Sequence, residues 1–516
     1  MEKRNPIRRE EVDRRVIETE GQIAELFRHF DPFDIAEESA RRFRHLESGN
    51  AISTSPPHCM IRAIEAACAY GCPSTSLLLP PHSFTAILGA LLSADDPVME
   101  HLIDQPSLMG FKAYIHRTQI PLQRRLWSVP IGRAEMLFAD SHALPRVGAA
   151  FFQRFGLTPR HWVQIAFMAY AATGNKAGKH AFDDLYVEKL AESDIPVSAA
   201  KRFLSEVSLT PAQIGEQYRL LRYGNATTLP SAPWTWCQSP PILHQWPIMR
   251  FGRRWFVPAP SLLIPLFGEL LFKRLAEVAV GGLREELSDR FTTYVASVFG
   301  HQIPGCRVLR ERALRGDDGG KVCDLAVDLP NAILLIETKS VFFDRRTFTE
   351  NNLVSGPAKD LIDGAIQVAE TARRIVANRC PAAALDPKKP IVGMIATLGS
   401  LPQSNSDAWF DSGMTAFAKR RLGGPTLTPE LLCRPFVLGP DALETLAIHL
   451  HADPANLPSL TEEKQRGDNA LSDWPLFLND KVQSREHNLS YWQEAFDRLI
   501  KEFTTCGSHA IGHVHA

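Results

Sequence analysis

The residues best suited to chemistry lie in the segment KVCDLAVDLPNAILLIETKS, which carries Asp324, Glu337 and Lys339. Two apolar runs in this segment are separated by Pro330 and Asn331, which are typical turn residues, so we expect a hairpin of two strands. Side chains alternate between the two faces of a strand, so Glu337 and Lys339 share one face of the second strand. The pattern predicts two carboxylates and one amine at the same end of a hairpin.

The expected turn fixes the pairing of the two strands. With a two-residue turn, Leu329 pairs with Ala332, and Asp324 then lies directly opposite Glu337. Opposed Cβ atoms are about 4.5–5.5 Å apart, and two carboxylates at that distance repel each other. A divalent cation offsets this repulsion, and hard oxygen ligands suit Mg²⁺ or Mn²⁺. Lys339 adds a positive charge suited to orienting or deprotonating a water and to stabilising charge on a phosphate. A slip of one residue would put the carboxylates on opposite faces.

Asp324, followed after twelve residues by Glu337-Thr338-Lys339, resembles the catalytic motif of the PD-(D/E)xK nuclease superfamily. The resemblance covers residues 281–400. It implies a restriction-endonuclease-like αβββαβ core, in which a helix, three antiparallel strands, a helix and a strand follow one another. It also implies that Asp324, Glu337 and the Thr338 backbone carbonyl bind Mg²⁺ (or Mn²⁺) and that Lys339 serves catalysis.

Supporting residues follow from the same resemblance. Family members often carry a Gln on the helix after the motif, and Gln367 matches that position. Many also carry an acid on the first core helix, where this sequence has Thr292, so Glu285 and Glu286 are the candidate acids. The usual Pro before the first Asp is replaced by Cys323.

Basic residues near the motif are candidate contacts for a nucleic-acid backbone. Arg345 and Arg346 follow the second strand within a few residues, and Lys359 stands near the start of the next helix. Lys and Arg side chains in such places neutralise phosphates without reading the base sequence.

The elements that must position this site are predicted from periodicity and from turn residues. Before the motif, we expect a hairpin around Gly252 and two helical stretches. Through and after the motif, we expect four strands around one helix, then a short strand, a helix and a C-terminal amphipathic helix. The predicted ranges are Ile248–Phe251 and Trp255–Val257 (hairpin), Ser261–Val280 and Leu283–Phe299 (helices), Arg307–Leu314, Val322–Leu329 and Ala332–Ser340 (strands), Pro357–Ala377 (helix), Pro390–Leu398 and Pro435–Leu438 (strands), and Leu489–Phe503 (helix).

The chain of 516 residues allows about two to four domains. We expect a mainly helical domain over 1–225, in which Thr210 and Gln213 form a capping box. A Pro- and Trp-rich linker over 226–247 is followed by the nuclease-like domain, 248–450, and by a loop, helix and tail, 451–516. The fold class expected is α/β, or α+β overall.

Composition excludes several classes of protein. Apolar residues make up 45% and charged residues 22%, which excludes a fibrous rod and a mostly disordered chain. The 57 basic and 58 acidic side chains give a net charge of −1, which excludes a globally basic nucleic-acid coat but leaves room for a local basic groove. The charged N-terminal stretch is unlike a signal peptide, and the most apolar segment is too short to span a membrane. A cytoplasmic protein with reduced thiols is expected.

These inferences predict a metal-dependent endonuclease that acts on nucleic acid, with DNA favoured because most relatives cut DNA. The alternatives are a nuclease of the same fold that cuts RNA, including tRNA, and a catalytically inactive nucleic-acid-binding module. A surface Glu–Lys pair with Asp324 in solvent is the non-functional interpretation. A free nuclease endangers its own cell, which favours a homodimer or a regulatory partner protein, and a role in bacterial restriction or antiviral defence by analogy.

A second set of metal-binding residue types lies near the N-terminus. His58, Cys59, Cys68 and Cys72 could form a zinc site, but their spacing is not that of paired zinc knuckles. We interpret these cysteines as buried core residues.

Overall fold

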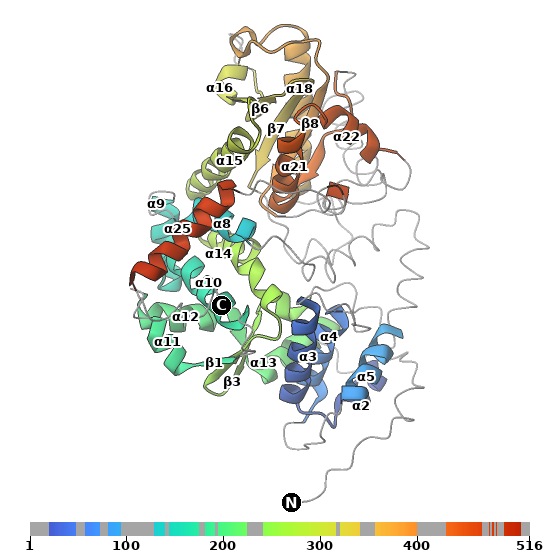
Figure 1. Ribbon diagram of the computed structural model, residues 1–516, viewed down its shortest axis with the longest axis vertical. Helices are drawn as coiled ribbons and strands as arrows, with labels where there is room; N and C mark the ends of the chain where they lie inside the picture. The colour runs from blue at the N-terminus through green and yellow to red at the C-terminus, as the bar shows by residue number, and fades with distance from the viewer. Residues whose placement is uncertain are drawn as a thin grey trace, which may run out of the picture. The chain divides into compact units, whose positions relative to one another are not determined.

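The structure, a computed structural model (Figure 1), describes most of the chain in separate stretches. The described residues are 20–47, 57–72, 81–93, 128–139, 144–174, 181–190, 195–223, 241–315, 320–340, 357–399, 430–466, 474, 477–478, 481 and 490–506.

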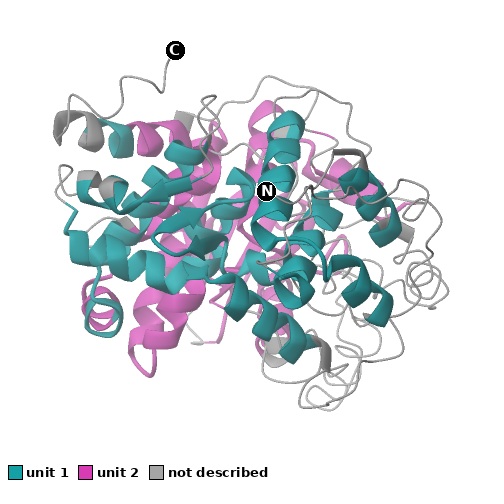
Figure 2. Ribbon diagram, turned by 90° about the horizontal axis from the view of Figure 1, so that it is seen from below, with its two compact units in different colours: residues 1–127, 151–271, 498–516 teal, residues 128–150, 272–497 magenta. Residues whose placement is uncertain are grey.

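The chain is of mixed α/β class and divides into two compact units (Figure 2). Unit 1 consists of 1–127, 151–271 and 498–516, and unit 2 consists of 128–150 and 272–497. Each unit contains one small mixed sheet. None of the helices in the described ranges is long and apolar enough to cross a membrane.

Unit 1 is mainly helical and includes most of the stretch predicted as a helical domain, 1–225, but not 128–150. Its α4 is buried along most of its length, in a core that also takes side chains from the neighbouring helices. The described helices are α2 (Glu20–Phe27), α3 (Pro32–Glu47), α4 (Pro57–Tyr70), α5 (Pro81–Ser93), α10 (Pro159–Gly174), α11 (Asp184–Leu190), α12 (Val197–Val207), α13 (Pro211–Tyr223) and the 3₁₀ segments η5 (Ile242–His244) and η6 (Pro260–Phe267). Three helices continue from one unit into the other: α9 (Pro145–Phe155), α14 (Glu269–Val278) and α25 (Ser490–Cys506).

The predicted capping box begins α13. Gln213 donates its backbone N–H to Thr210 Oγ1 at 3.3 Å, and Thr210 donates its N–H to Gln213 Oε1 at 2.9 Å. These two bonds satisfy backbone groups that a helix N-terminus leaves unpaired.

The predicted hairpin is present but belongs to unit 1. Strand β3 (Ile248–Phe251) pairs antiparallel with β4 (Arg254–Phe256) around Gly252, whose φ of 61° favours glycine. Outside the hairpin, β1 (Ala181–Asp183) pairs with β4 and β2 (Ser208–Leu209) pairs with β3. This pairing ties the hairpin to the helical unit, so the unit boundary falls at 271/272 and not in the 226–247 linker.

Unit 2 is built on a five-stranded sheet in the order β5-β6-β7-β8-β9. Its first strands are antiparallel and its last ones parallel. From residue 283 to residue 397 the elements follow one another as helix, strand, short helix, two strands, helix, 3₁₀ turn and strand. The described elements are α8 (Ser128–Ala134), the π segment η2 (Glu135–Ala139), α15 (Leu283–Gln302), β5 (Arg307–Arg310), α16 (Glu311–Leu314), β6 (Leu325–Asp328), β7 (Ile333–Lys339), α18 (Pro357–Val376), η7 (Pro381–Ala383), β8 (Ile391–Thr397), β9 (Phe436–Leu438), α21 (Pro440–Ala452) and α22 (Leu457–Lys464).

The register predicted for the hairpin of β6 and β7 is confirmed. Leu325 pairs with Ile336, and Leu329 donates its N–H to the Ala332 carbonyl at 2.9 Å. One step beyond the first pair, Asp324 therefore lies opposite Glu337.

Several boundaries differ from the prediction. The stretch predicted as a strand to Leu314 leaves the sheet after Arg310 and forms α16. The expected helix over 261–280 is a 3₁₀ segment followed by α14, because Pro265 and Gly268 interrupt it. The expected loop region after 453 contains α22.

Helices α15 and α18 cover opposite faces of the five-stranded sheet. A Cβ on Gly364 of α18 would lie 3.3 Å from Glu337 Cγ and 3.2 Å from Lys339 Cε. On the other face, Thr338 contacts Thr292 of α15. Because successive residues of a strand face opposite ways, the end of β7 meets both helices.

Candidate active site

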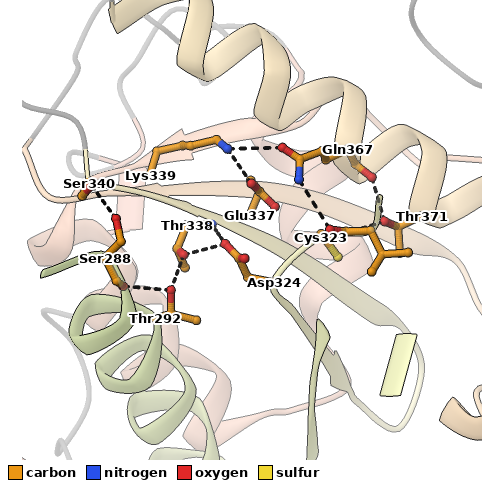
Figure 3. Close-up of polar contacts among 11 residues, drawn as sticks. Ser288, Thr292, Cys323, Asp324, Glu337, Thr338, Lys339, Ser340, Gln367 and Thr371 are labelled. Atoms are coloured by element: carbon orange, nitrogen blue, oxygen red, sulfur yellow. Dashed lines mark hydrogen bonds and ion pairs between the residues drawn. The ribbon is translucent and has the colours of Figure 1, made fainter. Parts of the chain in front are cut away.

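The carboxylates and the amine of the predicted motif meet at the C-terminal end of β7 (Figure 3). Glu337 and Lys339 belong to β7, and Asp324 immediately precedes β6. Asp324 is fixed at its backbone because its carbonyl accepts the Glu311 N–H at 2.7 Å. The strand pairing therefore brings Asp324, thirteen residues before Glu337, to the same end of the sheet as Glu337 and Lys339.

Glu337 is the most buried of the three, with 2% of its surface exposed. Its Oε1 accepts a hydrogen bond from Lys339 Nζ at 2.6 Å, while its Oε2 is buried and has no partner in the described part of the chain. Burial, and then the charge of Asp324, raises the pKa of Glu337 to about 8, although Lys339 opposes the shift. Such burial excludes a simple surface Glu–Lys pair.

Asp324 is held by the residue between the other two. Its Oδ2 accepts the Thr338 backbone N–H at 2.7 Å and the Thr338 hydroxyl at 2.6 Å. Asp324 lies opposite Glu337 in register. Its carboxylate accepts hydrogen bonds from these two donors, which offset its negative charge, whereas the Glu337 carboxylate would repel it. Within the described residues both hydrogen bonds to the Asp324 carboxylate fall on Oδ2, which leaves Oδ1 for an outside ligand.

Helix α18 supports the opposite side of the site. Lys339 Nζ also donates to Gln367 Oε1 at 3.3 Å, so Gln367, the predicted supporting residue, lies beside Lys339. One turn later, Thr371 Oγ1 accepts the Cys323 N–H at 2.8 Å. The helix therefore holds both the lysine and the backbone just before Asp324 (Figure 3).

Helix α15 approaches through hydroxyl groups. Thr292 Oγ1 lies 2.5 Å from Thr338 Oγ1, and Ser288 Oγ lies 2.6 Å from Ser340 Oγ. These pairs fix the residues on either side of Lys339.

Neither candidate acid of α15 contributes to these contacts. Glu286 accepts the backbone N–H groups of Arg146 at 3.2 Å and Val147 at 2.7 Å, so it caps the first turn of α9. Glu285 lies exposed in the first turn of α15. The prediction of a supporting acid is wrong for Glu286, because the start of α9 takes its carboxylate, and Thr292 stands at the site instead.

The predicted phosphate contacts cannot be placed. Arg345 and Arg346 lie outside the described residues, and so does the side chain of Lys359.

The chemistry of the site fits a divalent cation. The described residues contain no group of three or more His, Cys, Asp or Glu side chains that could hold a metal ion. The candidate site has two such side chains, Asp324 and Glu337, and the third ligand expected is the carbonyl of Thr338. The donor set is hard oxygen, and the buried Glu337 Oε2 needs a positively charged or donating partner. Of the N-terminal cysteines predicted to be buried core residues, Cys59 and Cys68 are buried, whereas Cys72 is half-buried.

Sequence reasoning missed the hydroxyl partners Ser288, Thr292 and Thr371. A spacing signal exists for each, because Ser288 and Thr292 share one helical face, and Thr371 stands four residues after Gln367. It also missed Gly364, whose lack of a side chain lets α18 approach Glu337 and Lys339 closely.

Comparison of the chain with family models, with curated proteins and with solved structures gives no match.

Proposed function

We propose that this chain is a metal-dependent nuclease that hydrolyses phosphodiester bonds, with DNA as the favoured substrate. The observation that carries the proposal is the pair of carboxylates formed where the half-buried Asp324 lies opposite the buried Glu337, with Lys339 bonded to Glu337. The order of elements in unit 2 supports a restriction-endonuclease-like core.

The residues have separate roles in this proposal. Asp324, Glu337 and the Thr338 carbonyl would hold Mg²⁺ or Mn²⁺, and the bound cation would activate a water and offset charge on the phosphate. Lys339 provides a fixed cation, because Glu337 and Gln367 tether its Nζ. Its N–H groups can donate to a phosphate oxygen or orient the attacking water.

Exposed basic residues near Asp324 support a polyanionic substrate. Arg310 and Arg312 flank the backbone group that bonds to the Asp324 carbonyl, and Lys321 lies three residues before Asp324. Glu311, the acid between the two arginines, is paired with Arg315 at 2.5 Å. This leaves a local excess of positive charge beside the site in a chain that is neutral overall.

The test is a cleavage assay with Mg²⁺ or Mn²⁺ on supercoiled plasmid, linear duplex, single-stranded DNA and total cellular RNA, each offered separately. Lys339→Ala removes the tethered amine. Lys388→Ala is the matched control, because Lys388 is exposed in the turn before β8, at the other end of the strands. We expect cleavage of DNA by the wild type and by Lys388→Ala, and none by Lys339→Ala.

Other outcomes separate the alternatives. A discrete RNA product with intact DNA would establish the RNA nuclease. Retention of nucleic acid that Lys339→Ala leaves unchanged, with no product in either metal, would favour a binding module. Cleavage by Lys339→Ala at the wild-type rate would exclude the proposed site. By analogy, we also propose a role in bacterial defence, with a dimer or a regulatory partner restraining the enzyme.

A further inference from the structure

A chain of hydroxyl groups leads from α15 to Asp324. Thr292 Oγ1 lies 2.5 Å from Thr338 Oγ1, and Thr338 Oγ1 lies 2.6 Å from Asp324 Oδ2. Thr292 Oγ1 is also 3.0 Å from the Ser288 carbonyl, four residues earlier in the helix. All three side chains are half-buried, and Figure 3 shows Thr338 between Thr292 and Asp324.

The number of protons gives this chain a direction. A hydroxyl has one proton to donate, and an ionised carboxylate can only accept. Thr338 therefore uses its proton on Asp324, and its contact with Thr292 requires Thr292 as the donor. To donate to Thr338, the Thr292 hydroxyl must rotate so that its proton points at Thr338 Oγ1 and no longer at the Ser288 carbonyl.

We propose that Thr292 is a positioning residue for the cation site, acting on Asp324 through the side chain of Thr338. By donating to Thr338, Thr292 keeps the Thr338 hydroxyl pointed at Oδ2 and so keeps Oδ1 available to a cation. The inference rests on the proposed function, because it assigns a role within the same site.

Among the described contacts, the Asp324 carboxylate is held by the Thr338 backbone N–H, which the strand fixes, and by the Thr338 hydroxyl, whose rotamer Thr292 sets. Thr338 lies on the α15 face of β7, between Glu337 and Lys339 on the α18 face. The second hydroxyl pair, Ser288 with Ser340, holds the next residue on the α15 face. Loss of the Thr292 hydroxyl therefore frees the Thr338 rotamer while the strand beside it stays fixed.

The test measures the Mn²⁺ dissociation constant of the full chain by electron paramagnetic resonance. Thr292→Val removes the hydroxyl and keeps the shape, and Thr292→Ser restores the hydroxyl. Thr293→Val is the matched control, because the neighbouring hydroxyl contacts Arg310 at 3.4 Å. Residues that orient metal ligands typically contribute about 10–100-fold to affinity, and Thr292 acts one bond further away. We therefore expect Thr292→Val to weaken Mn²⁺ binding about three- to tenfold, and Thr292→Ser and Thr293→Val to bind as the wild type does.

A double-mutant cycle tests the route through Thr338. In a Thr338→Val background, Thr292→Val should cost nothing further, because the acceptor of its proton is gone. Additive losses would refute the route. Thermal unfolding confirms that each variant is folded, and Thr292→Ala replaces Thr292→Val if the latter does not fold.

The outcomes separate this inference from the proposed function. If the wild type and Thr292→Val bind Mn²⁺ equally while Asp324→Ala does not bind it, the inference falls and the metal site stands. If the wild type binds no Mn²⁺, both fall. Saturating Mn²⁺ should also restore cleavage by Thr292→Val, since the defect lies in cation affinity.

Discussion

Replacing Glu337 with Gln should make the metal-free protein more stable at high pH. Glu337 is buried beside Asp324, and its pKa is raised to about 8, first by burial and then by the Asp324 charge. The native state therefore holds a proton that the unfolded chain releases above about pH 4.5, so the free energy of unfolding falls as the pH rises between these values. Gln keeps an oxygen for Lys339 and does not ionise.

The size of the effect follows from the width of that pH window. Each pH unit within it changes the free energy of unfolding by up to about 1.4 kcal/mol. Between about pH 5 and pH 8 the wild type should lose about 2–4 kcal/mol relative to Glu337→Gln. Glu444 is also buried, and its pKa is raised to about 7 mainly by burial, but it titrates in both proteins and cancels in the difference.

The measurement is urea unfolding of both proteins in EDTA across this pH range. Parallel pH profiles would show that Glu337 ionises freely and would refute the burial argument. Mn²⁺ should then stabilise the wild type, because a ligand that binds only the native state adds to stability. The same Mn²⁺ concentration should leave Glu337→Gln nearly unchanged.

Gly364→Ala should lower Mn²⁺ affinity severalfold, because the added Cβ would press on Glu337 and Lys339. The control is Gly89→Ala, whose Cβ meets nothing within 4 Å. It should only stabilise its helix by about 1 kcal/mol, which thermal unfolding can check. Arg133→Met should destabilise the chain by about 3–5 kcal/mol in urea unfolding, because it leaves the buried Glu444 carboxylate, 2.9 Å away, without its cation. A loss below about 1 kcal/mol would mean that the pair is solvated. Arg312→Ala should reduce the slope of log affinity for duplex DNA against log salt by about one if Arg312 contacts a phosphate, and an unchanged slope would exclude that contact.

The hairpin register was predictable because the constraints on it are local. A two-residue turn fixes which residues pair, and the apolar runs of β6 and β7 allow one register only if their buried faces are to stay buried. Once the register is set, Asp324 must lie opposite Glu337. The alternation of side chains along a strand then places Glu337 and Lys339 on the same face. Gln367 was predictable only through a family pattern, because no local rule relates a helix to a strand some thirty residues earlier.

Other features depend on contacts that periodicity does not record. Glu286 and Thr292 stand on the same helix, and the sequence favoured the acid for the site. The structure uses the acid to cap α9, whose free N–H groups attract a carboxylate, and places Thr292 beside Thr338. The segment 128–150 joins unit 2, although it precedes that unit by more than a hundred residues, because Arg133 pairs with the buried Glu444. A linear pattern cannot reveal such an ion pair.

Three unfavourable features coincide at the end of β7. Glu337 Oε2 is buried without a partner among the described residues, and a second carboxylate lies opposite it. The covering helix carries a glycine at 364, where alanine has the higher intrinsic helix propensity. Apolar side chains at these positions would continue the core that surrounds them. When several rules of stable folding are broken at one place, that place is expected to bind a ligand and not to stabilise the fold. A divalent cation would offset the first two of these costs directly, and the glycine is what allows α18 to bring Gln367 to Lys339.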